Sequence, residues 1–426
     1  MTGIVHVVGA GLSGLACATA LAGSGLRVTL HEATDHAGGR CRSWHDGTLD
    51  RVIDNGNHLI LGANRECLSY LDRIGGRNEL LTVDPVCLPF LDLRDGRSWT
   101  LRPGNGRLPL WLADPARRVP DSHLIDYLAM LTLAVAGAHR RVADMLPEEG
   151  PLADRLWKPL AVSILNTPYR DGSARMLWSV FRRTLLLGAE ACRPFIAGPG
   201  GLSAALVDPA LAFLTERRGD IRFGQRLKRL DRSPDGAATA LIFTGGECVL
   251  GRDDHVVLAV PAEAAGTLLP GLPVPDRFHP ILNAHFRLDR QVPLPGGQPW
   301  LGLVGGVAEW LFGRGDVVSV TVSAADALID RPAEELAALL WRDVASALGL
   351  DPSTPATSRI IKERRATFAA TPEQQRRRPG SRLARNLHLA GDWTDTGLPP
   401  TIEGAVQSGH RVAALIRRRV AGRDPV

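Results

Sequence analysis

Short apolar runs at the start of the chain predict two strands with a helix between them. Residues 4–8 and 26–31 are short and largely apolar, whereas residues 15–21 are rich in alanine and leucine. Runs of roughly four to eight apolar residues are typical of buried strands, and alanine and leucine favour a helix. The order of strand, helix and strand predicts an α/β fold.

Three glycines lie in the turn between the first strand and the helix. Gly9 permits the tight turn, Gly11 lets the backbone approach a pyrophosphate, and Gly14 lets the helix pack against the strand. The start of the helix, at Leu12 and Ser13, offers free N–H groups and a partial positive charge to phosphates. The turn is therefore predicted to bind a dinucleotide.

An acidic residue follows the second strand. Glu32 lies eighteen residues after Gly14, close to the roughly 20 expected of the acid that accepts hydrogen bonds from ribose hydroxyls. Its carboxylate would repel a 2′-phosphate, so NADP is not expected. The sequence Gly38-Gly39-Arg40 comes next, and it favours a flavin over a nicotinamide because nicotinamide sites rarely need it.

The far end of the chain predicts another strand and helix. Residues 386–394 indicate a strand that ends in a turn, and residues 397–406 open a helix. Pro400 suits the first turn of that helix, where its missing N–H is not needed. Apolar or small residues then recur at the spacing of a buried helix face.

These motifs resemble a known superfamily. Gly-Gly-Arg at 38–40, Ile-Asp-Asn-Gly-Asn-His at 53–58 and Gly-Asp-Trp at 391–393 resemble the FAD-binding signature of the flavin amine oxidases and carotenoid desaturases. Together with residues 394–406 they look like the squalene-associated FAD-dependent proteins, the hydroxysqualene dehydroxylases of the bacterial hopanoid pathway. The resemblance implies a Rossmann-like FAD-binding domain of the amine oxidase/phytoene desaturase type with an inserted α+β substrate domain.

The resemblance also implies roles for individual residues. Arg40 would contact the FAD pyrophosphate, Asp392 would hydrogen-bond the ribityl chain, and Leu227 would meet the adenine through its backbone. The helix near residue 402 would point its positive end at the flavin pyrimidine. The predicted cofactor-binding residues are Gly9, Gly11, Leu12, Ser13, Gly14, Glu32, Gly39, Arg40, Asn57, His58, Leu227, Gly391, Asp392, Thr401 and Ile402.

Two discontinuous domains are predicted. The FAD-binding domain comprises residues 1–85, 196–271 and 378–426, and the substrate-binding domain comprises residues 86–195 and 272–377. The substrate domain is expected to contain a helical stretch at 122–146. Strands near 284–288 and 317–322 and a helix at 333–348 suit an antiparallel sheet.

The reaction implied by the resemblance is reductive: hydroxysqualene and reduced FAD give squalene, water and oxidised FAD. The site must protonate a poor leaving group and exclude water that would recapture the allylic cation. His58 and Asp54 are the candidate acids, with Asp395 in reserve. The unperturbed pKa of histidine, roughly 6.5, suits an acid at neutral pH. Structural roles within the loop remain open for both His58 and Asp54.

Composition bears on partners and compartment. The net charge of +5 is mild for 426 residues, and no nucleic-acid-binding signature accompanies it. Six scattered cysteines without paired spacing indicate a reducing cytoplasm, with neither a disulfide framework nor a metal site. No cysteine follows Cys248, so a C-terminal thioether to the flavin is impossible and non-covalent FAD is expected.

A membrane surface is a further predicted partner. The longest apolar run, residues 128–138, is too short to cross a bilayer, which needs about 20 residues. It precedes His139-Arg140-Arg141, and apolar residues with basic neighbours are typical of an interfacial helix. An ordinary core helix is the alternative. The expected location is the cytoplasm, with peripheral association at the inner face of the membrane.

Other functions of the same fold stay open. A carotenoid-type desaturase or an amine oxidase would be oxidative, but three tyrosines are few for the aromatic cage of an amine oxidase. A prenyl-binding protein of the GDP-dissociation-inhibitor type would lack FAD. No second Gly-x-Gly-x-x-Gly is present, so the flavin would exchange electrons with the substrate, oxygen, a quinone or a separate, unidentified electron donor.

Overall fold

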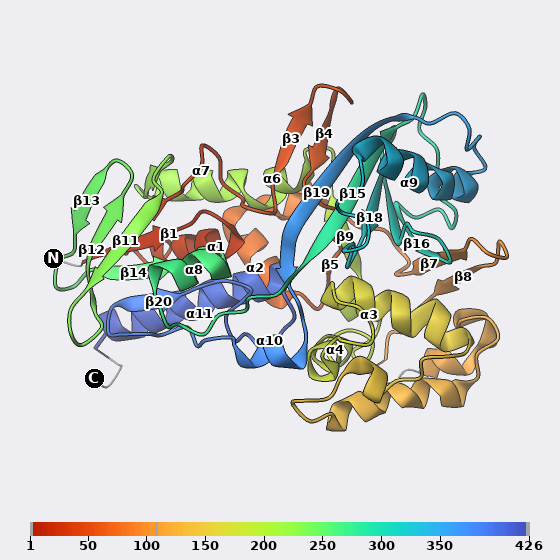
Figure 1. Cartoon of the computed structure of the whole chain (residues 1–426), viewed down its shortest axis with the longest axis horizontal. Coiled ribbons are helices and arrows are strands. Elements are labelled where there is room, and N and C mark those ends of the chain that lie inside the picture. The colour runs from red at the N-terminus through yellow and green to blue at the C-terminus, as the bar shows by residue number, and fades with distance from the viewer. Residues whose placement is uncertain (1–2, 107–109, 423–426) are drawn as a thin grey trace.

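The computed structural model describes residues 3–106 and 110–422. The molecule is elongated, with a parallel sheet at one end, near both chain termini, and a larger sheet with its own helices at the other end (Figure 1). Residues 1–2 and 423–426 of the predicted FAD-binding domain and residues 107–109 of the predicted substrate domain lie outside the described residues.

A five-stranded parallel sheet brings together three distant parts of the chain, in the order β10-β2-β1-β14-β20. Its strands are β1 (Ile4–Val8), β2 (Arg27–His31), β10 (Asp220–Arg222), β14 (His255–Leu258) and β20 (Leu387–Leu389). The carboxyl ends of β1 and β2 lead into the glycine turn and Glu32. In open α/β sheets, ligands bind at this edge.

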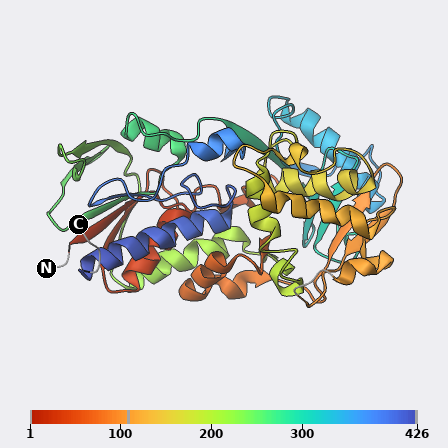
Figure 2. The same ribbon diagram turned by 90° about the horizontal axis from the view of Figure 1, so that it is seen from below.

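Helices from both ends of the chain pack against each other beside this sheet (Figure 2). They are α1 (Leu12–Ala22), α2 (Arg65–Ile74), α6 (Gly201–Leu206), α7 (Asp208–Glu216) and α11 (Ile402–Val420). Where α1 meets α11, a Cβ added to Gly409 would lie 2.2 Å from the carbonyl oxygen of Ser13. Only glycine allows the first and last helices this close approach.

Smaller elements complete this end of the molecule. They are the antiparallel sheet β11 (Leu227–Arg232), β12 (Ala238–Phe243) and β13 (Gly246–Val249), the helix α8 (Ala262–Leu268), the hairpin β3 (Ser43–Asp46) and β4 (Arg51–Asp54), the sheet β5 (Ile60–Leu61), β9 (Pro194–Ala197) and β6 (Leu80–Leu81), and the 3₁₀ turn η1 (Gly76–Glu79). The hairpin and β5 flank the segment 54–58, so the predicted flavin loop lies between regular elements.

The larger sheet has seven strands in the order β19-β15-β18-β17-β16-β7-β8. They are β7 (Leu88–Asp92), β8 (Ser98–Leu101), β15 (Phe278–Arg287), β16 (Trp300–Val304), β17 (Trp310–Arg314), β18 (Val317–Val322) and β19 (Thr357–Phe368). One face packs its aliphatic side chains against α9 (Ala333–Leu348). The other face carries polar and aromatic side chains and lies toward the segment 54–58 and the remaining helices.

Those helices form a third group, coloured from orange to yellow in Figure 1. They are η2 (Leu110–Ala113), η3 (Pro115–Arg117), η4 (Leu124–Val135), η5 (Val142–Asp144), the π-helical turn η6 (Ala153–Trp157), α3 (Lys158–Leu165), α4 (Ala174–Phe181) and α5 (Ala189–Cys192). The short helix α10 (Pro372–Arg376), drawn in blue, comes from the later part of the chain.

The prediction of one helical stretch over 122–146 is wrong. The structure has two 3₁₀ segments, η4 and η5, separated by residues 136–141. Ala136 is extended and is followed by Gly137, which ends the first segment. The Asp144 carboxylate accepts the N–H of Arg141, which starts the second. Capping contacts therefore divide the segment 122–146 into two helical pieces, although its composition predicts a single helix.

Candidate functional site

Two glycines of the turn, Gly9 and Gly14, are closely packed, whereas the third, Gly11, has free space beside it. A Cβ added to Gly9 would lie 2.4 Å from the carbonyl oxygen of Ala259, and one added to Gly14 would lie 1.9 Å from that of Gly9. Nothing lies within 4 Å of a Cβ added to Gly11. The turn is thus held tightly to the sheet while its tip, followed by Leu12 and Ser13 at the start of α1, stays open to a ligand.

Glu32 supports this turn from the end of β2. One carboxylate oxygen accepts the N–H of Ala10 at 2.8 Å, and the other accepts the N–H of Thr34 at 2.9 Å. The backbone oxygen of Glu32 accepts the N–H of Gln225, two residues before Leu227 at the start of β11. Glu32 and Leu227, predicted to meet the two ends of an adenosine, therefore lie on neighbouring segments.

Arg40 joins the two ends of the chain. Its guanidinium donates to the Asp392 carboxylate at 2.8 Å and also to the Ala366 carbonyl. Gly39, with φ +57°, lies against Gly11: a Cβ added there would meet only the Gly11 Cα, at 3.4 Å. The charge of Asp392 raises the pKa of Arg40.

Arg40 also remains accessible. Its side chain keeps 46% of its accessible surface, whereas the Asp392 side chain keeps 9%. Arg40 can therefore reach a ligand close to the glycine turn, with the nearly buried Asp392 behind it.

Asp54 is held by the protein on both carboxylate oxygens. One accepts the Ser43 hydroxyl at 2.5 Å and the N–H of Leu202 at 2.8 Å, and the other accepts Arg314 Nη1 at 2.8 Å. The side chain is buried. These contacts favour the structural role for Asp54 over that of a proton donor.

The segment 54–58 rests on the polar face of the seven-stranded sheet. Its contacts are the Asn57 amide to the Thr321 hydroxyl (3.1 Å), the Asn283 amide to the Asn55 carbonyl (3.2 Å), His285 Nε2 to the Asp54 carbonyl (3.0 Å) and the Asn55 amide to the Glu363 carboxylate (3.1 Å). The loop predicted to run beside the flavin is thus fixed to three strands of the seven-stranded sheet, β15, β18 and β19.

Sequence reasoning missed these sheet residues. Asn283 and His285 alternate with the apolar residues Leu282, Ala284 and Phe286, which pack on the α9 side. Alternation of polar and apolar residues shows that one face of a strand is polar. It does not show which loop that face meets, and so the partners of the segment 54–58 could not be named.

His58 ends this segment with its imidazole free. No described residue hydrogen-bonds either ring nitrogen, and the side chain remains partly accessible. Burial lowers its pKa to about 4, Asp54 raises it and Arg40 lowers it further. His58 is therefore neutral at pH 7, and the alternative in which it fixes the loop through backbone hydrogen bonds lacks the bonds it requires.

Asp395, the reserve acid, lies elsewhere. It is exposed and lines a surface hollow of about 540 Å³ together with Trp178, Arg182 and Arg376. Its backbone N–H donates to the Pro379 carbonyl. Its surroundings are solvent and arginine side chains.

The N-terminus of α11 is the contribution of the C-terminal part of the chain to the site. The Thr401 hydroxyl accepts the N–H of Gly404 at 3.1 Å and caps the helix, whose first residue is Ile402. Gly391 is required because an added Cβ would lie 2.4 Å from Trp393 Nε1. That indole donates to the Val260 carbonyl and is buried, so Trp393 packs in the core.

These observations fit a bound flavin dinucleotide. The open tip at Gly11, a helix N-terminus, an acid at Glu32 and an accessible arginine are the groups that a pyrophosphate and a ribose require. The fold and the site therefore define a class, the dinucleotide-binding oxidoreductases.

Comparison with known families agrees. Residues 12–417 match the model of the flavin containing amine oxidoreductases. The chain belongs to the flavin-containing amine oxidoreductase family. Membership confirms the sequence predictions of a flavin cofactor and of an oxidoreductase.

Curated relatives with similar sequences indicate which members of this family the chain resembles most. The chain is 47% identical to a hydroxysqualene dehydroxylase of Rhodopseudomonas palustris over 98% of this chain and 99% of the relative. It is 46% identical to one of Sinorhizobium fredii over 96% of this chain and 97% of that relative. A 15-cis-phytoene desaturase of Synechococcus elongatus is 23% identical over 98% of both chains. The resemblance to the squalene-associated proteins is thereby confirmed.

Solved structures confirm the predicted fold class. Wild-type putrescine oxidase bound to putrescine superposes with a TM-score of 0.67 at 19% identity, over 98% of this chain and all of that one. Cyclohexylamine oxidase of Brevibacterium oxydans gives 0.70 at 14% identity, over 99% of this chain and all of that one. At such identities the likeness concerns the fold alone.

Proposed function

We propose that the chain catalyses the FAD-dependent reductive dehydroxylation of hydroxysqualene to squalene, a step of squalene and hopanoid biosynthesis. The observation that carries this function is the identity of 46–47% over nearly the full length to relatives named hydroxysqualene dehydroxylase. The residues around the glycine turn support it, because they provide every group that the cofactor needs.

FAD would be held without a covalent bond. The N–H groups at Leu12 and Ser13 and the guanidinium of Arg40 would bind the pyrophosphate, and Glu32 would bind the ribose. Asp392 would contact the ribityl chain. In its reduced form FAD supplies the hydride for the reaction. The helix N-terminus at Thr401 and Ile402 would favour negative charge on the adjacent flavin ring.

The protein must bring a proton to the leaving hydroxyl. His58 is partly accessible, no described residue hydrogen-bonds its ring nitrogens, and its pKa of about 4 keeps it neutral at pH 7. A neutral imidazole has one N–H donor and one acceptor nitrogen. We therefore assign His58 the role of a relay that passes a proton on, while burial of the site excludes water.

An anaerobic reaction tests the function. The protein is reduced with dithionite, hydroxysqualene is added, and flavin reoxidation is followed together with squalene by mass spectrometry. We expect both to occur with one squalene formed per flavin oxidised. A yellow protein that is not reoxidised would overturn the proposal, and a colourless protein would favour the lipid-binding alternative.

A matched pair of histidine variants tests the relay. His58→Ala should keep FAD and slow reoxidation roughly 10²–10⁴-fold, the usual value of a positioned acid or base. His45→Ala is the control, because His45 is exposed on β3 and contacts only Asp50. Normal turnover of His58→Ala would remove His58 from proton transfer.

A membrane surface is a second element of the proposal. Among the described residues there is no helix with the length and apolarity needed to cross a bilayer. The segment η4 nonetheless exposes one apolar face, formed by Leu124, Ile125, Leu128, Leu131 and Val135. Arg140, Arg141 and Arg175 are exposed nearby in the sequence or on the adjoining helix α4. This combination of apolar and basic side chains suits association with an anionic lipid surface on the cytoplasmic side. The C30 hydrocarbon product would pass from the protein into that lipid surface.

A further inference from the structure

Glu309 stands at an irregularity in the seven-stranded sheet. Its N–H donates to the Thr321 carbonyl at 3.2 Å, while the next residue, Trp310, is the ladder partner of Thr321. Two residues opposite one form a β-bulge, which turns a side chain out of the regular alternation and is common next to active sites. The Glu309 carboxylate accordingly reaches the end of β18, where it accepts the N–H of Ser323 at 2.9 Å.

This position adjoins the loop beside the flavin. Thr321, which receives the Glu309 N–H on its carbonyl, receives the Asn57 amide on its hydroxyl. The next residue after Asn57 is His58. On the other side, the N–H of Ala324 donates to the Asn166 side chain at the end of α3. Glu309 therefore lies where the sheet, the flavin loop and the helical group meet.

The carboxyl group of Glu309 has no cationic partner among the described residues. Charged groups on the neighbouring elements have other partners: Asp343 of α9 accepts the N–H groups of Val307 and Ala308, and His279 of β15 pairs with Asp326. Burial raises the pKa of Glu309 to about 7, against the opposing hydrogen bonds from Ser323. The side chain still keeps part of its accessible surface.

We propose that Glu309 is the carboxylic acid that protonates the leaving hydroxyl of the substrate. This rests on the proposed function. The O–H bond of the carboxyl breaks and its proton goes to the hydroxyl oxygen; the C–O bond breaks and water leaves. The substrate carbon gains a hydride from reduced FAD, which is oxidised by two electrons, and the Glu309 carboxylate regains a proton from solvent by way of the His58 relay.

The neighbouring groups are poor sources of this proton. Both carboxylate oxygens of Asp54 are engaged by Ser43, the N–H of Leu202 and Arg314, and His58 is neutral at pH 7. A buried carboxyl without a cation stays protonated to higher pH and can donate a hydrogen bond or a proton. Glu309 supplies the acid, and His58 can at most pass the proton on.

The test compares Glu309→Gln, Glu309→Asp and the control Glu335→Gln, which changes an exposed glutamate on α9. Flavin reoxidation by hydroxysqualene is measured anaerobically from pH 5.5 to 8.5, and FAD content is read from the visible spectrum. Glu309→Gln should keep FAD and slow reoxidation roughly 10²–10⁴-fold, whereas the control should match the wild type. Glu309→Asp, which keeps the acid, should recover part of the rate.

The pH profile separates an acid from a structural residue. The wild-type rate should fall as the pH rises through about 7, and this fall should be absent in Glu309→Gln. Normal turnover of Glu309→Gln, or a wild-type rate that is constant over this range, would overturn the proposal. The wild-type profile decides the matter even if a variant fails to fold. Failure of the wild type to convert hydroxysqualene would instead refute the proposed function.

Discussion

Three ionisable residues around the flavin loop have different surroundings. Asp54 is hydrogen-bonded on both carboxylate oxygens, burial keeps His58 neutral at pH 7, and burial without a cation raises the pKa of Glu309 to about 7. Such divergence among neighbouring groups is the usual basis for dividing acid, base and structural roles within one site. Residue type alone would have ranked His58 first.

Arg40 is the residue on which cofactor retention should depend most. Replacement by alanine should weaken FAD binding by roughly tenfold to a hundredfold, because a charged hydrogen bond is lost and Asp392 stays nearly buried without its partner. Arg40→Lys should be intermediate, since an ammonium cannot serve two phosphate oxygens in a fork. FAD retention after dialysis is the measurement.

The control for this series is Arg418→Ala, which removes an exposed arginine near the end of α11. It should retain FAD like the wild type. Equal retention by Arg40→Ala and Arg40→Lys would show that Arg40 does not bind the pyrophosphate.

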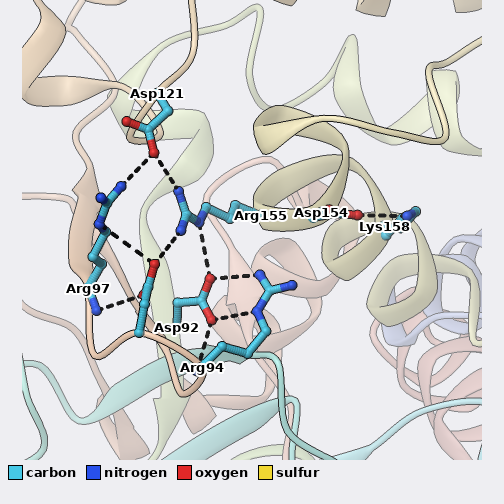
Figure 3. A network of polar contacts seen from close by, with 8 residues as sticks. Asp92, Arg94, Arg97, Asp121, Asp154, Arg155 and Lys158 are labelled. Carbon is cyan, nitrogen blue, oxygen red and sulfur yellow. Dashed lines mark hydrogen bonds and ion pairs between the residues drawn. The ribbon is translucent and has the colours of Figure 1, made fainter.

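At the scale of elements, a network of ion pairs fastens the turn after β7 to the π-helical turn η6 (Figure 3). The buried Asp92 carboxylate accepts Arg94 Nη2 at 2.7 Å and Arg155 Nε at 3.1 Å. Arg155 also donates to Asp95 and Asp121. The network joins an edge of the seven-stranded sheet to the helical group, so it fixes one wall of the substrate domain.

Asp92→Asn should reduce the free energy of unfolding by about 3 kcal/mol at pH 7, because one partner of a buried ion pair is neutralised. Hydrogen bonds from Arg94, more than those from Arg155, lower the pKa of Asp92 to about 2. The stabilising effect is therefore complete above pH ~4, the range of an unfolded aspartate, and is lost as the pH falls towards 2. Urea unfolding of both proteins at several pH values measures it.

Asp154→Asn is the matched control. Asp154 forms a half-exposed pair with Lys158 one helical turn away, visible in the same figure, and such pairs contribute only about 0.3–0.5 kcal/mol. Equal unfolding midpoints for the two variants, or a difference from the wild type that persists at pH 2, would contradict the role of Asp92.

At the scale of the whole molecule, the helical group that contains η4 lies at the same end as the seven-stranded sheet (Figures 1 and 2). On η4, Tyr127, Met130 and Leu133 are buried while other apolar side chains are exposed, so the same short element faces both the core and the exterior. The exposed side chains are where the proposed membrane association can be tested.

The triple variant Ile125→Ser, Leu128→Ser, Val135→Ser should lower binding to anionic liposomes at least about tenfold, since burying each large apolar side chain contributes roughly 1.5–3 kcal/mol. Two of these side chains are 72% and 81% exposed, so the fold should tolerate the change. Co-sedimentation at low salt measures it. Val249→Ser, at an equally exposed site on β13, is the control. Wild-type binding that stays at background would sink the membrane proposal.

Much of the cofactor site follows from sequence because its parts are local. The glycine turn, Glu32 and the Gly-Gly-Arg element each depend on a strand and the residues beside it, and all three lie within the first forty residues. The helical stretch at 122–146 was mispredicted because its interruption is not marked by a motif of this kind. Its break combines the extended Ala136, followed by Gly137, with a capping contact between Asp144 and Arg141 that composition does not reveal.

The sequence by itself determined the class of cofactor, the family and the strand–turn–helix geometry, because those depend on short-range steric rules. Only the tertiary structure decided the pairing of Arg40 with Asp392, 352 residues apart, and of Asn57 with Thr321, 264 residues apart. It also decided which acid keeps its proton. Burial and the absence of a cation set the pKa of Glu309, and both are properties of the assembled fold rather than of any segment.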